Sequence, residues 1–489
     1  MHELYIIGVV LSWIAIAITI IHMVMDNKQP AKTMAWALVI LFVPIVGIIF
    51  YLFFGLNHRK EKLDSQRSLD QLSKRSMLSF VEQHDFKVPE HYKPLVDLFV
   101  NQNLALPFKD NQVDIMTDGY AFFPELLKDI NQAKDHIHID MYIIEDDALG
   151  RLIADALMQK AREGVEVRMI YDDVGCWKTS HQFIEMMRRA GIEIVPFLPV
   201  RFPSFTSKAN YRNHRKLIII DGQTGYIGGM NIALRYVKGR GQQPWRDTML
   251  RLTGGVVYGL QKAFLVDWYF VDRTLITNRR YYPPSSLLTP HSSLLTPHSS
   301  LLTPHSSLVA QVVTSGPITP YPEIMQGFVS AILAARRYLY IETPYFLPNE
   351  PVLFALKTAA VGGVDVRIIC PKHSDARFTE WASRSYLREL HDAGAKIYLY
   401  HAGFLHSKLM ICDDSLSTTG STNVDFRSFE NNFEANVFIY DQGTALRLKK
   451  IFMDDLSQST PLSDMPNRLH PKFAQRLWES LTRLFSPLL

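Results

Sequence analysis

Two strand-like stretches, His136-Ile-His-Ile-Asp140 and Gly164-Val-Glu-Val-Arg-Met-Ile170, decide the fold, because the same pair returns later in the chain. The later pair reads Tyr338-Leu-Tyr-Ile-Glu342 and Gly363-Val-Asp-Val-Arg-Ile-Ile369. In both places a stretch of helical character separates two short apolar runs that have the length of buried strands. Repetition in the same order indicates two related halves.

A third pair of matching stretches follows a predicted helix in each half. These are Ala190-Gly-Ile-Glu-Ile-Val195 and Ala393-Gly-Ala-Lys-Ile-Tyr398. A single match of this kind arises by chance among α/β proteins, whereas three in the same order favour a duplication. Because strands alternate with helices in both halves, we predict an α/β fold with one sheet in each half.

The segment between the halves repeats the heptad Ser-Ser-Leu-Leu-Thr-Pro-His three times, from Ser285 to His305. Proline in every heptad excludes a continuous helix or a central strand, so we predict an exposed flexible loop. Its histidines, His291, His298 and His305, raise the alternative of a metal site. We favour a tandem duplication tolerated at the surface, because a mobile segment does not hold histidines in a coordination geometry.

The N-terminal residues have a different composition from the rest of the chain. An apolar run extends from Leu4 to Met25, and a second run without charge extends from Met34 to Phe54. Each run is long enough to cross about 30 Å of hydrocarbon as a helix. A cleaved signal peptide is the alternative for the first run, but the run lacks a basic N-terminal region and a second run follows at once. We therefore predict two transmembrane helices.

Basic residues predict the orientation of these helices, since they remain on the cytoplasmic side. The loop between the runs contains only Lys28 and Lys32. The stretch after the second run is richer in cations: Arg59, Lys60, Lys62, Arg67, Lys74 and Arg75. We therefore expect the large C-terminal part to lie in the cytoplasm.

Net charge and cysteine content exclude several classes of protein. The 52 basic and 48 acidic residues leave a formal charge of only +4, too little for a general nucleic-acid binder, so no nucleic-acid partner is expected. The three cysteines, Cys176, Cys370 and Cys412, are far apart and form no CxxC pair. Neither a disulfide framework nor a cysteine zinc site is predicted.

Both halves contain the pattern HxKxxxxD. The first copy runs from His214 through Lys216 to Asp221, and Asn231 follows a Gly-Gly pair. The second copy has the candidate residues His406, Lys408 and Asp413, with Asn423 after a Gly-Ser pair. The interval from histidine to asparagine is the same in both copies, and this agreement makes the pattern specific.

The residue types in this pattern suit phosphate chemistry. An apolar run after each histidine indicates a strand, so the histidine and the lysine two residues later share one face. Lysine supplies donors and a positive charge for a phosphate oxygen, asparagine adds neutral donors, and histidine is a nucleophile or proton carrier. Asp221 and Asp413 complete the set of catalytic candidates, but their odd spacing near strand ends favours a mainly structural role.

At these residues the sequence resembles the phospholipase D superfamily, and the flanking residues are similar to those of bacterial cardiolipin synthases. The flanks that carry this likeness are Arg212-Asn213-His214-Arg215-Lys216, Trp245-Arg246-Asp247-Thr248, Asp267-Trp268, Glu342-Thr-Pro-Tyr-Phe346, Asn423-Val-Asp-Phe-Arg-Ser-Phe429 and Asn432-Phe433-Glu434. The resemblance covers almost the whole chain, including the apolar N-terminus.

The resemblance implies an organisation of two phospholipase-D-like α/β domains in a pseudo-twofold arrangement, preceded by two transmembrane helices. The expected segments are a membrane anchor (1–60), a linker (61–110), a first domain (111–280), the repeat loop (281–310) and a second domain ending in an amphipathic helix (311–489). It also implies a bacterial plasma-membrane protein with several spans and a cytoplasmic catalytic part.

The implied reaction is the transfer of a phosphatidyl group between two phosphatidylglycerol molecules, without metal or other cofactor. His214 is the expected nucleophile, His406 the expected acid and base, and Lys216, Lys408, Asn231 and Asn423 the expected phosphate ligands. A hydrolytic phospholipase D or a phosphatidylserine synthase would use the same motifs with another acceptor. A nuclease or a non-catalytic membrane scaffold is disfavoured by the apolar N-terminus and by the intact motifs, respectively.

A histidine that alternates between neutral and cationic forms needs a carboxylate on its other nitrogen. Each half offers one downstream of its asparagine, namely Asp247 and Glu434. In relatives of this architecture the pairing crosses between the halves. We therefore expect Glu434 to contact His214 and Asp247 to contact His406, the alternative being ion pairs with nearby arginines such as Arg246.

The C-terminus contains apolar residues at helical spacing: Phe473, Leu477, Leu481, Leu484 and Leu488. Cations border this stripe: Lys472, Arg476 and Arg483. Such a helix suits an anionic membrane surface. The alternative, which the sequence alone favours, is that the stripe packs against the catalytic core.

Overall fold

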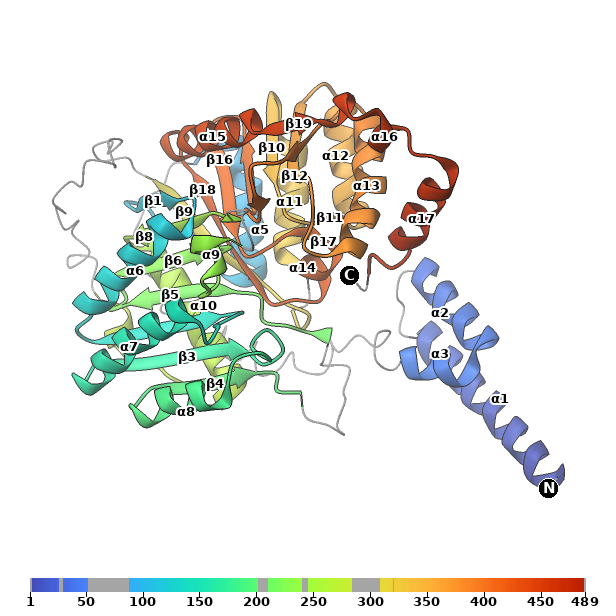
Figure 1. Cartoon of the computed structure of the whole chain (residues 1–489), viewed down its shortest axis with the longest axis horizontal. Coiled ribbons are helices and arrows are strands. Elements are labelled where there is room, and N and C mark those ends of the chain that lie inside the picture. The colour runs from blue at the N-terminus through green and yellow to red at the C-terminus, as the bar shows by residue number, and fades with distance from the viewer. Residues whose placement is uncertain are drawn as a thin grey trace.

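The computed structural model describes residues 2–25, 30–51, 88–200, 210–239, 245–283, 308–319 and 321–487. Figure 1 shows two α/β units side by side, with the helices α1 to α3 apart from both. Residues 52–87 and 284–307 lie outside the described residues. The first range contains the end of the predicted anchor and the start of the predicted linker, and the second contains all three heptads.

The first unit is built on a sheet of seven strands. Their order is β1 (Gln112–Met116), β8 (Met249–Thr253), β6 (Thr224–Gly228), β5 (Lys216–Ile220), β2 (His136–Met141), β3 (Glu166–Asp172) and β4 (Glu193–Phe197). Strands β2, β3 and β4 are parallel, while β5 runs antiparallel to β2. The three stretches chosen from the sequence are therefore neighbours in one sheet.

The second unit repeats this order and adds one strand. Its sheet contains β9 (Val309–Ser315), β18 (Glu434–Tyr440), β16 (Leu416–Gly420), β15 (Leu409–Cys412), β10 (Tyr338–Glu342), β12 (Asp365–Pro371), β13 (Lys396–Tyr400) and β19 (Ser459–Pro461). Strands β10, β12 and β13 are parallel, and β15 runs antiparallel to β10. The predicted duplication of an α/β sheet is confirmed.

Helices cover the sheets and connect the parallel strands. In the first unit these are α6 (Gly119–Gln132), α7 (Ala148–Arg162), α8 (His181–Arg189), α9 (Arg235–Lys238) and α10 (Val256–Asp272). In the second they are α11 (Glu323–Ala334), α12 (Glu350–Val361), α13 (Arg377–Asp392), α14 (Phe426–Glu430), α15 (Gln442–Ser457), α16 (Pro466–Leu469) and α17 (Phe473–Arg483). The side chains of Asp118, Asp147 and Ser180 cap the first turns of α6, α7 and α8.

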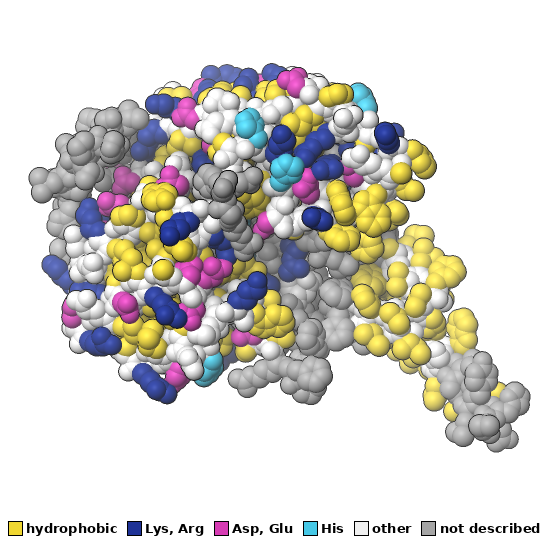
Figure 2. Space-filling view, viewed as in Figure 1, with side chains coloured by type: hydrophobic (Ala, Val, Ile, Leu, Met, Phe, Trp, Pro, Cys, Tyr) yellow, Lys and Arg dark blue, Asp and Glu magenta, His cyan; other side chains and the backbone are white. Residues whose placement is uncertain are grey.

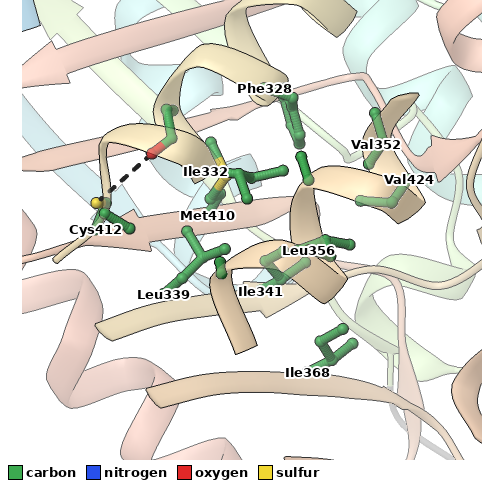
Figure 3. Close-up of a cluster of buried hydrophobic side chains, with 14 of the residues drawn as sticks. Phe328, Ile332, Leu339, Ile341, Val352, Leu356, Ile368, Met410, Cys412 and Val424 are labelled. Atoms are coloured by element: carbon green, nitrogen blue, oxygen red, sulfur yellow. Dashed lines mark hydrogen bonds between the residues drawn. The ribbon is translucent and has the colours of Figure 1, made fainter. Parts of the chain in front are cut away.

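Each unit has its own hydrophobic core, and a third buried cluster joins them. Figure 3 shows the core of the second unit, where Phe328 and Ile332 of α11 and Leu339 and Ile341 of β10 lie together, with Leu356 of α12. The joining cluster contains side chains from both sheets: Leu217, Ile227 and Leu252 from the first, and Val312, Val437 and Ile439 from the second. Burial of this shared apolar surface holds the two units in one orientation.

The described part of the predicted linker contains a helix that packs on the second unit. Helix α5 (Lys93–Asn103) lies in residues 88–110 and buries Leu95 and Phe99 in the core of the second unit. The ring of Phe99 packs 4.6 Å from the ring of Phe438, measured between centroids. A short apolar face on this helix therefore makes it part of the second unit.

The second apolar run of the N-terminus differs from the single helix that the sequence predicts. It is divided into α2 (Pro30–Phe42) and α3 (Pro44–Phe50), whereas the first run forms one helix, α1 (His2–Met25). Proline at position 44 lacks an amide hydrogen and disfavours helical geometry at Val43, which has φ −135° and ψ 70°. Among the described residues, none of the helices combines the length and the apolar composition needed to cross a membrane.

Helix α17 packs on the second unit, but with the opposite face from the one that the sequence favours. Its buried residues are Glu479 and Thr482, while Phe473, Leu477, Leu481 and Leu484 are exposed. The buried Glu479 carboxylate lies 2.6 Å from the guanidinium of Arg388 on α13. This ion pair needs the polar face inward, so the expectation that the apolar stripe packs on the core was wrong.

Candidate functional site

His214 and His406 lie at corresponding places, just before β5 and β15, and each is held by a strand-like contact with the other unit. The backbone N–H of His214 donates to the carbonyl of Phe433 at 2.9 Å. The backbone N–H of His406 donates to the carbonyl of Arg246 at 2.7 Å. These contacts bring the residue that follows each carbonyl, Glu434 or Asp247, directly beside the histidine of the other unit.

The first crossed pair joins His214 to Glu434. The Nδ1 atom of His214 lies 3.0 and 3.2 Å from the two carboxylate oxygens of Glu434, which is fully buried at the start of β18. The hydroxyl of Ser421 and the amide of Asn432 also donate to this carboxylate. Burial alone would raise the pKa of Glu434, but His214 and Lys216 outweigh it and hold that pKa below its usual range.

The second crossed pair joins His406 to Asp247. The Nδ1 atom of His406 lies 2.6 Å from a carboxylate oxygen of Asp247, which is fully buried. Two short parallel strands, β7 (Trp245–Arg246) and β14 (Phe404–Leu405), place these side chains together. A Cβ atom at Gly229 would come within 2.1 Å of an Asp247 carboxylate oxygen, so a larger residue there would displace this carboxylate from His406.

Both crossed contacts that the sequence predicts are therefore present. Since Nδ1 of each ring faces a carboxylate, Nε2 is the nitrogen on the other side of the ring. That of His406 lies 3.4 Å from the ammonium of Lys408. Burial and the neighbouring lysine lower the pKa of His406 to about 4, although Asp247 opposes the change. Burial also lowers the pKa of His214, with Glu434 opposing. Both imidazoles are accordingly neutral at pH 7 in the site without substrate.

Lys216 and Lys408 lie in the same buried site. Each ammonium donates to the backbone carbonyl of the histidine two residues earlier, His214 or His406. Burial lowers the pKa of Lys216 to about 7, and the charge of Lys408 contributes to this fall. Burial likewise lowers the pKa of Lys408, against the opposing charges of Asp247 and Glu434. The two motifs therefore form one electrostatically coupled site rather than two separate ones.

Asn231 and Asn423, the predicted phosphate ligands, are engaged by protein groups. The Asn231 amide nitrogen donates to the hydroxyl of Tyr236 at 2.8 Å, and its oxygen accepts from the backbone of Ile143. The amide nitrogen of Asn423 donates to Asp425 at 3.0 Å. In this arrangement both side chains fix the loops around the histidines.

Asp221 and Asp413 lie at the far ends of strands β5 and β15 and not beside the histidines. The carboxylate of Asp221 accepts from the backbone N–H groups of residues 134, 135 and 136. That of Asp413 accepts from the backbone of residues 336, 337 and 338. Both residues also adopt positive φ, 53° and 52°. These contacts agree with the mainly structural role expected from the sequence, because they fix the start of β2 and β10.

Several aromatic residues that were not predicted as site residues surround the two histidines. The ring of Tyr142 lies 4.8 Å from that of His214, and Lys216 lies 5.1 Å from the same tyrosine ring. The rings of Trp245 and Tyr345 lie 5.3 and 6.5 Å from His406. Apart from the family-like flanks that contain Trp245 and Tyr345, no spacing pattern distinguishes these aromatic residues from core residues.

A buried arginine between two acids also supports each histidine. Beside His214, Arg215 forms an ion pair with Asp267 and donates to the backbone carbonyl of Glu434 at 3.0 Å. Asp140, which accepts from Asn213, completes this cluster. Burial and the charge of Asp267 raise the pKa of Asp140 well above its ordinary value.

The second cluster crosses between the units. Arg246, next to Asp247, lies 2.8 Å from a carboxylate oxygen of Asp455 and 3.6 Å from one of Glu342. Burial raises the pKa of Glu342 to about 8, with Arg246 opposing and Asp455 adding to the rise. Because a single arginine faces two buried carboxyl groups, burial raises the pKa of Asp455 as well as that of Glu342.

Family models and known proteins match this chain over most of its length. A family model described as cardiolipin synthase, PLD-like domain, matches residues 126–242 and 328–456, and one described as phospholipase D-nuclease N-terminal matches residues 11–55. A cardiolipin synthase of Oceanobacillus iheyensis is 39% identical over 490 residues, which is 97% of either chain. A cardiolipin synthase of Geobacillus sp. strain WCH70 is 37% identical over 471 residues, covering 95% of this chain and 90% of the relative.

One solved structure shows the same fold. The crystal structure of phosphatidylserine synthase from Haemophilus influenzae superposes with a TM-score of 0.61 at 16% sequence identity. The match covers 82% of this chain and 100% of that chain. The two-unit α/β architecture is therefore shared well beyond recognisable sequence similarity.

Proposed function

This chain belongs to the cardiolipin synthase family and is a phosphatidyltransferase, and on that premise we propose that it transfers the phosphatidyl group of one phosphatidylglycerol to another, releasing glycerol. The observation that carries the proposal is the reciprocal pairing of His214 with Glu434 and His406 with Asp247 around two buried lysines. Two histidines, each with its own carboxylate, suit a reaction of two successive phosphoryl displacements.

In the first step the Nε2 atom of His214 attacks phosphorus and forms a phosphatidyl-histidine. The bond from phosphorus to the headgroup glycerol oxygen breaks. His406, which takes up a proton when the anionic phosphodiester binds, gives that oxygen its proton. Glu434 contacts Nδ1 of His214 and stabilises the positive charge that develops on the ring. Asp247 supports the protonated form of His406 in the same way.

In the second step a hydroxyl of another phosphatidylglycerol attacks the intermediate. Neutral His406 takes the proton of that hydroxyl, the bond from phosphorus to His214 breaks, and cardiolipin results. Lys216 and Lys408 supply positive charge for the phosphoryl oxygens in both steps. Asn231 and Asn423 contribute through the loops that they fix.

We further propose that residues 1–60 anchor the enzyme in the bacterial plasma membrane in two spans, with the catalytic part in the cytoplasm. Helix α1 is suited to an apolar environment, because its large apolar side chains are exposed. Examples are Ile7, Leu11, Trp13, Ile14 and Ile18. Protease treatment of inside-out and right-side-out vesicles tests the orientation. Digestion of the catalytic part only in inside-out vesicles is expected, and digestion only in right-side-out vesicles would contradict it.

The test of the reaction is incubation of the purified protein with phosphatidylglycerol in micelles and analysis of the products by mass spectrometry. Cardiolipin and glycerol in equal amounts are expected. Phosphatidic acid as the main product would identify water as the acceptor, and phosphatidylserine formed on addition of serine, given a suitable phosphatidyl donor, would identify a serine acceptor. Either result would replace the proposed reaction while leaving the family assignment intact.

A further inference from the structure

The outward face of α13 and α17 is the feature that the reaction chemistry does not use. Six apolar side chains form it: Phe378, Phe473, Leu477, Trp478, Leu481 and Leu484, here called the α13–α17 face. Phe473 is 81% exposed and Leu484 is 74% exposed. Figure 2 shows hydrophobic side chains gathered over this part of the second unit.

The structure fixes this face outward by a specific polar contact. Glu479, fully buried on the inner side of α17, forms ion pairs with Arg388 at 2.6 Å and Arg384 at 3.6 Å. The rings of Phe378 and Trp381 on α13 lie 6.3 and 5.7 Å from that of Trp478, so the two helices present their aromatic residues together. Exposure of this apolar surface is thus built into the packing of α17.

The exposed charges beside the face include several cations, while Asp375 before α13 is an exposed acid. Glu479 is the only acidic residue of α17, and it faces inward. Lys472 and Arg476 are exposed at the N-terminal end of the helix, and Arg377 is exposed at the start of α13. Aromatic and aliphatic side chains bordered by cations are typical of helices that lie at the interface of an anionic membrane.

The face is also connected to the catalytic site. Asp375, two residues before α13, accepts a hydrogen bond from the hydroxyl of Tyr345 at 2.7 Å. The ring of Tyr345 in turn lies 6.5 Å from that of His406. The segment directly before α13 is therefore linked to His406 through the side chains of Asp375 and Tyr345.

We propose that the α13–α17 face binds the surface of a bilayer that contains anionic phospholipid, and that this contact places the catalytic site against the membrane that supplies its substrate. The proposal rests on the proposed function only for the identity of the substrate. The face then contacts lipid and is not covered by a second copy of the chain or by helices α1 to α3.

Site-directed fluorescence quenching in the full-length protein tests the contact. Leu481→Cys carries an environment-sensitive label in vesicles of phosphatidylcholine and phosphatidylglycerol, with doxyl-labelled lipid as the quencher. The matched control is Leu446→Cys on α15, a leucine with similar exposure (45%, against 42% for Leu481). The native cysteines are buried, so the introduced one is labelled selectively. Quenching several-fold stronger at position 481 is expected.

Equal quenching at both positions, or none at position 481, would overturn the proposal. The proposal would also be overturned if the label at position 481 were shielded from water without quenching and cross-linked to a second copy or to residues 2–51. Another occupant would then cover the face. The Leu477→Glu/Leu481→Glu variant adds a functional measure. Since both side chains are exposed, folding is preserved, and activity on vesicles is expected to fall by about tenfold or more, equivalent to about 1.4 kcal/mol of membrane binding.

Activity toward a short-chain, monomeric phosphatidylglycerol separates this proposal from the reaction itself. The double variant is expected to match the wild-type protein on the monomeric substrate, whereas an equal loss on both substrates would contradict a membrane role. If the wild-type protein makes no cardiolipin from either substrate, the proposed function fails. The quenching at position 481 still decides whether the face contacts lipid.

Discussion

The carboxylate of Asp247 lies 2.6 Å from Nδ1 of His406, although the two residues belong to different halves of the chain. Glu434 and His214 make the same contact in the opposite direction, at 3.0 Å. Each half therefore supplies a histidine and the carboxylate that its counterpart needs. Neither half contains both members of a pair, so the proposed mechanism requires both halves.

Replacement of the paired carboxylates tests their role. Asp247→Asn and Glu434→Gln keep the shape of the side chain but stabilise the wrong tautomer and remove the negative charge, so kcat is expected to fall by about 10²- to 10⁴-fold. Substrate KM is expected to change little. Asp97→Asn, at an exposed position on α5, is the control. A variant that retained wild-type kcat would exclude its carboxylate from the mechanism.

Substrate binding is expected to take up protons near pH 7. Burial lowers the pKa of His406 to about 4 and that of Lys216 to about 7. Neither group is therefore fully protonated at pH 7. An anionic phosphodiester beside them favours the protonated forms. Calorimetry of phosphatidylglycerol binding in buffers of different ionisation enthalpy measures the uptake. Zero uptake would mean that His406 is not recharged by the substrate and that its acid role needs another proton source.

Acid stability depends on the buried imidazole of His406. Its pKa is lowered on folding, so the unfolded chain binds more protons between pH 6.5 and about 4. Its contribution is fully present above pH 6.5 and is lost as pH falls toward 4, by an amount of about 3 kcal/mol. His406→Gln should therefore lose less stability over this range than the wild-type protein. Parallel urea titrations at several pH values would contradict this if the two proteins declined equally.

The cluster of Arg246, Glu342 and Asp455 has the opposite pH dependence. Because burial raises the pKa of Glu342 to about 8, the folded protein binds more protons than the unfolded chain between pH 4.5 and 8. This contribution is present below pH 4.5 and is lost as pH rises through 8. Glu342→Gln should lose less stability than the wild-type protein from pH 6 to 9, measured by thermal unfolding. Identical curves would show that Glu342 is ionised throughout.

The duplication could be predicted because it depends on local patterns, and the crossed pairs could be predicted because relatives of this architecture have them. Apolar runs of strand length recur around His136 and Tyr338, and the two HxKxxxxD motifs lie at equal intervals from Asn231 and Asn423. The chemical need of a histidine for a carboxylate, together with the family resemblance, then selected Asp247 and Glu434. Backbone pairing between the units brings each of these carboxylates beside its histidine.

Features that depend on long-range packing could not be predicted. Helical periodicity identifies the apolar face of α17 but not the direction it points, which Arg384 and Arg388 decide by binding Glu479. The sequence shows Asn231 near the motif, but only the fold shows that Tyr236 accepts its amide hydrogen. Pro44 divides the second apolar run into two helices, an effect that the apolar composition of the run does not show.

The most direct test of the two-histidine mechanism uses a phosphatidyl ester of p-nitrophenol, a leaving group that departs without protonation. His406→Ala retains the nucleophile but lacks the base for the second step. It should therefore release one equivalent of p-nitrophenol in a burst and accumulate a phosphatidyl group on His214, detected by mass spectrometry of peptides kept at neutral pH. His214→Ala should show neither burst nor adduct. A burst from His214→Ala with the adduct on His406, and none from His406→Ala, would contradict the assigned roles.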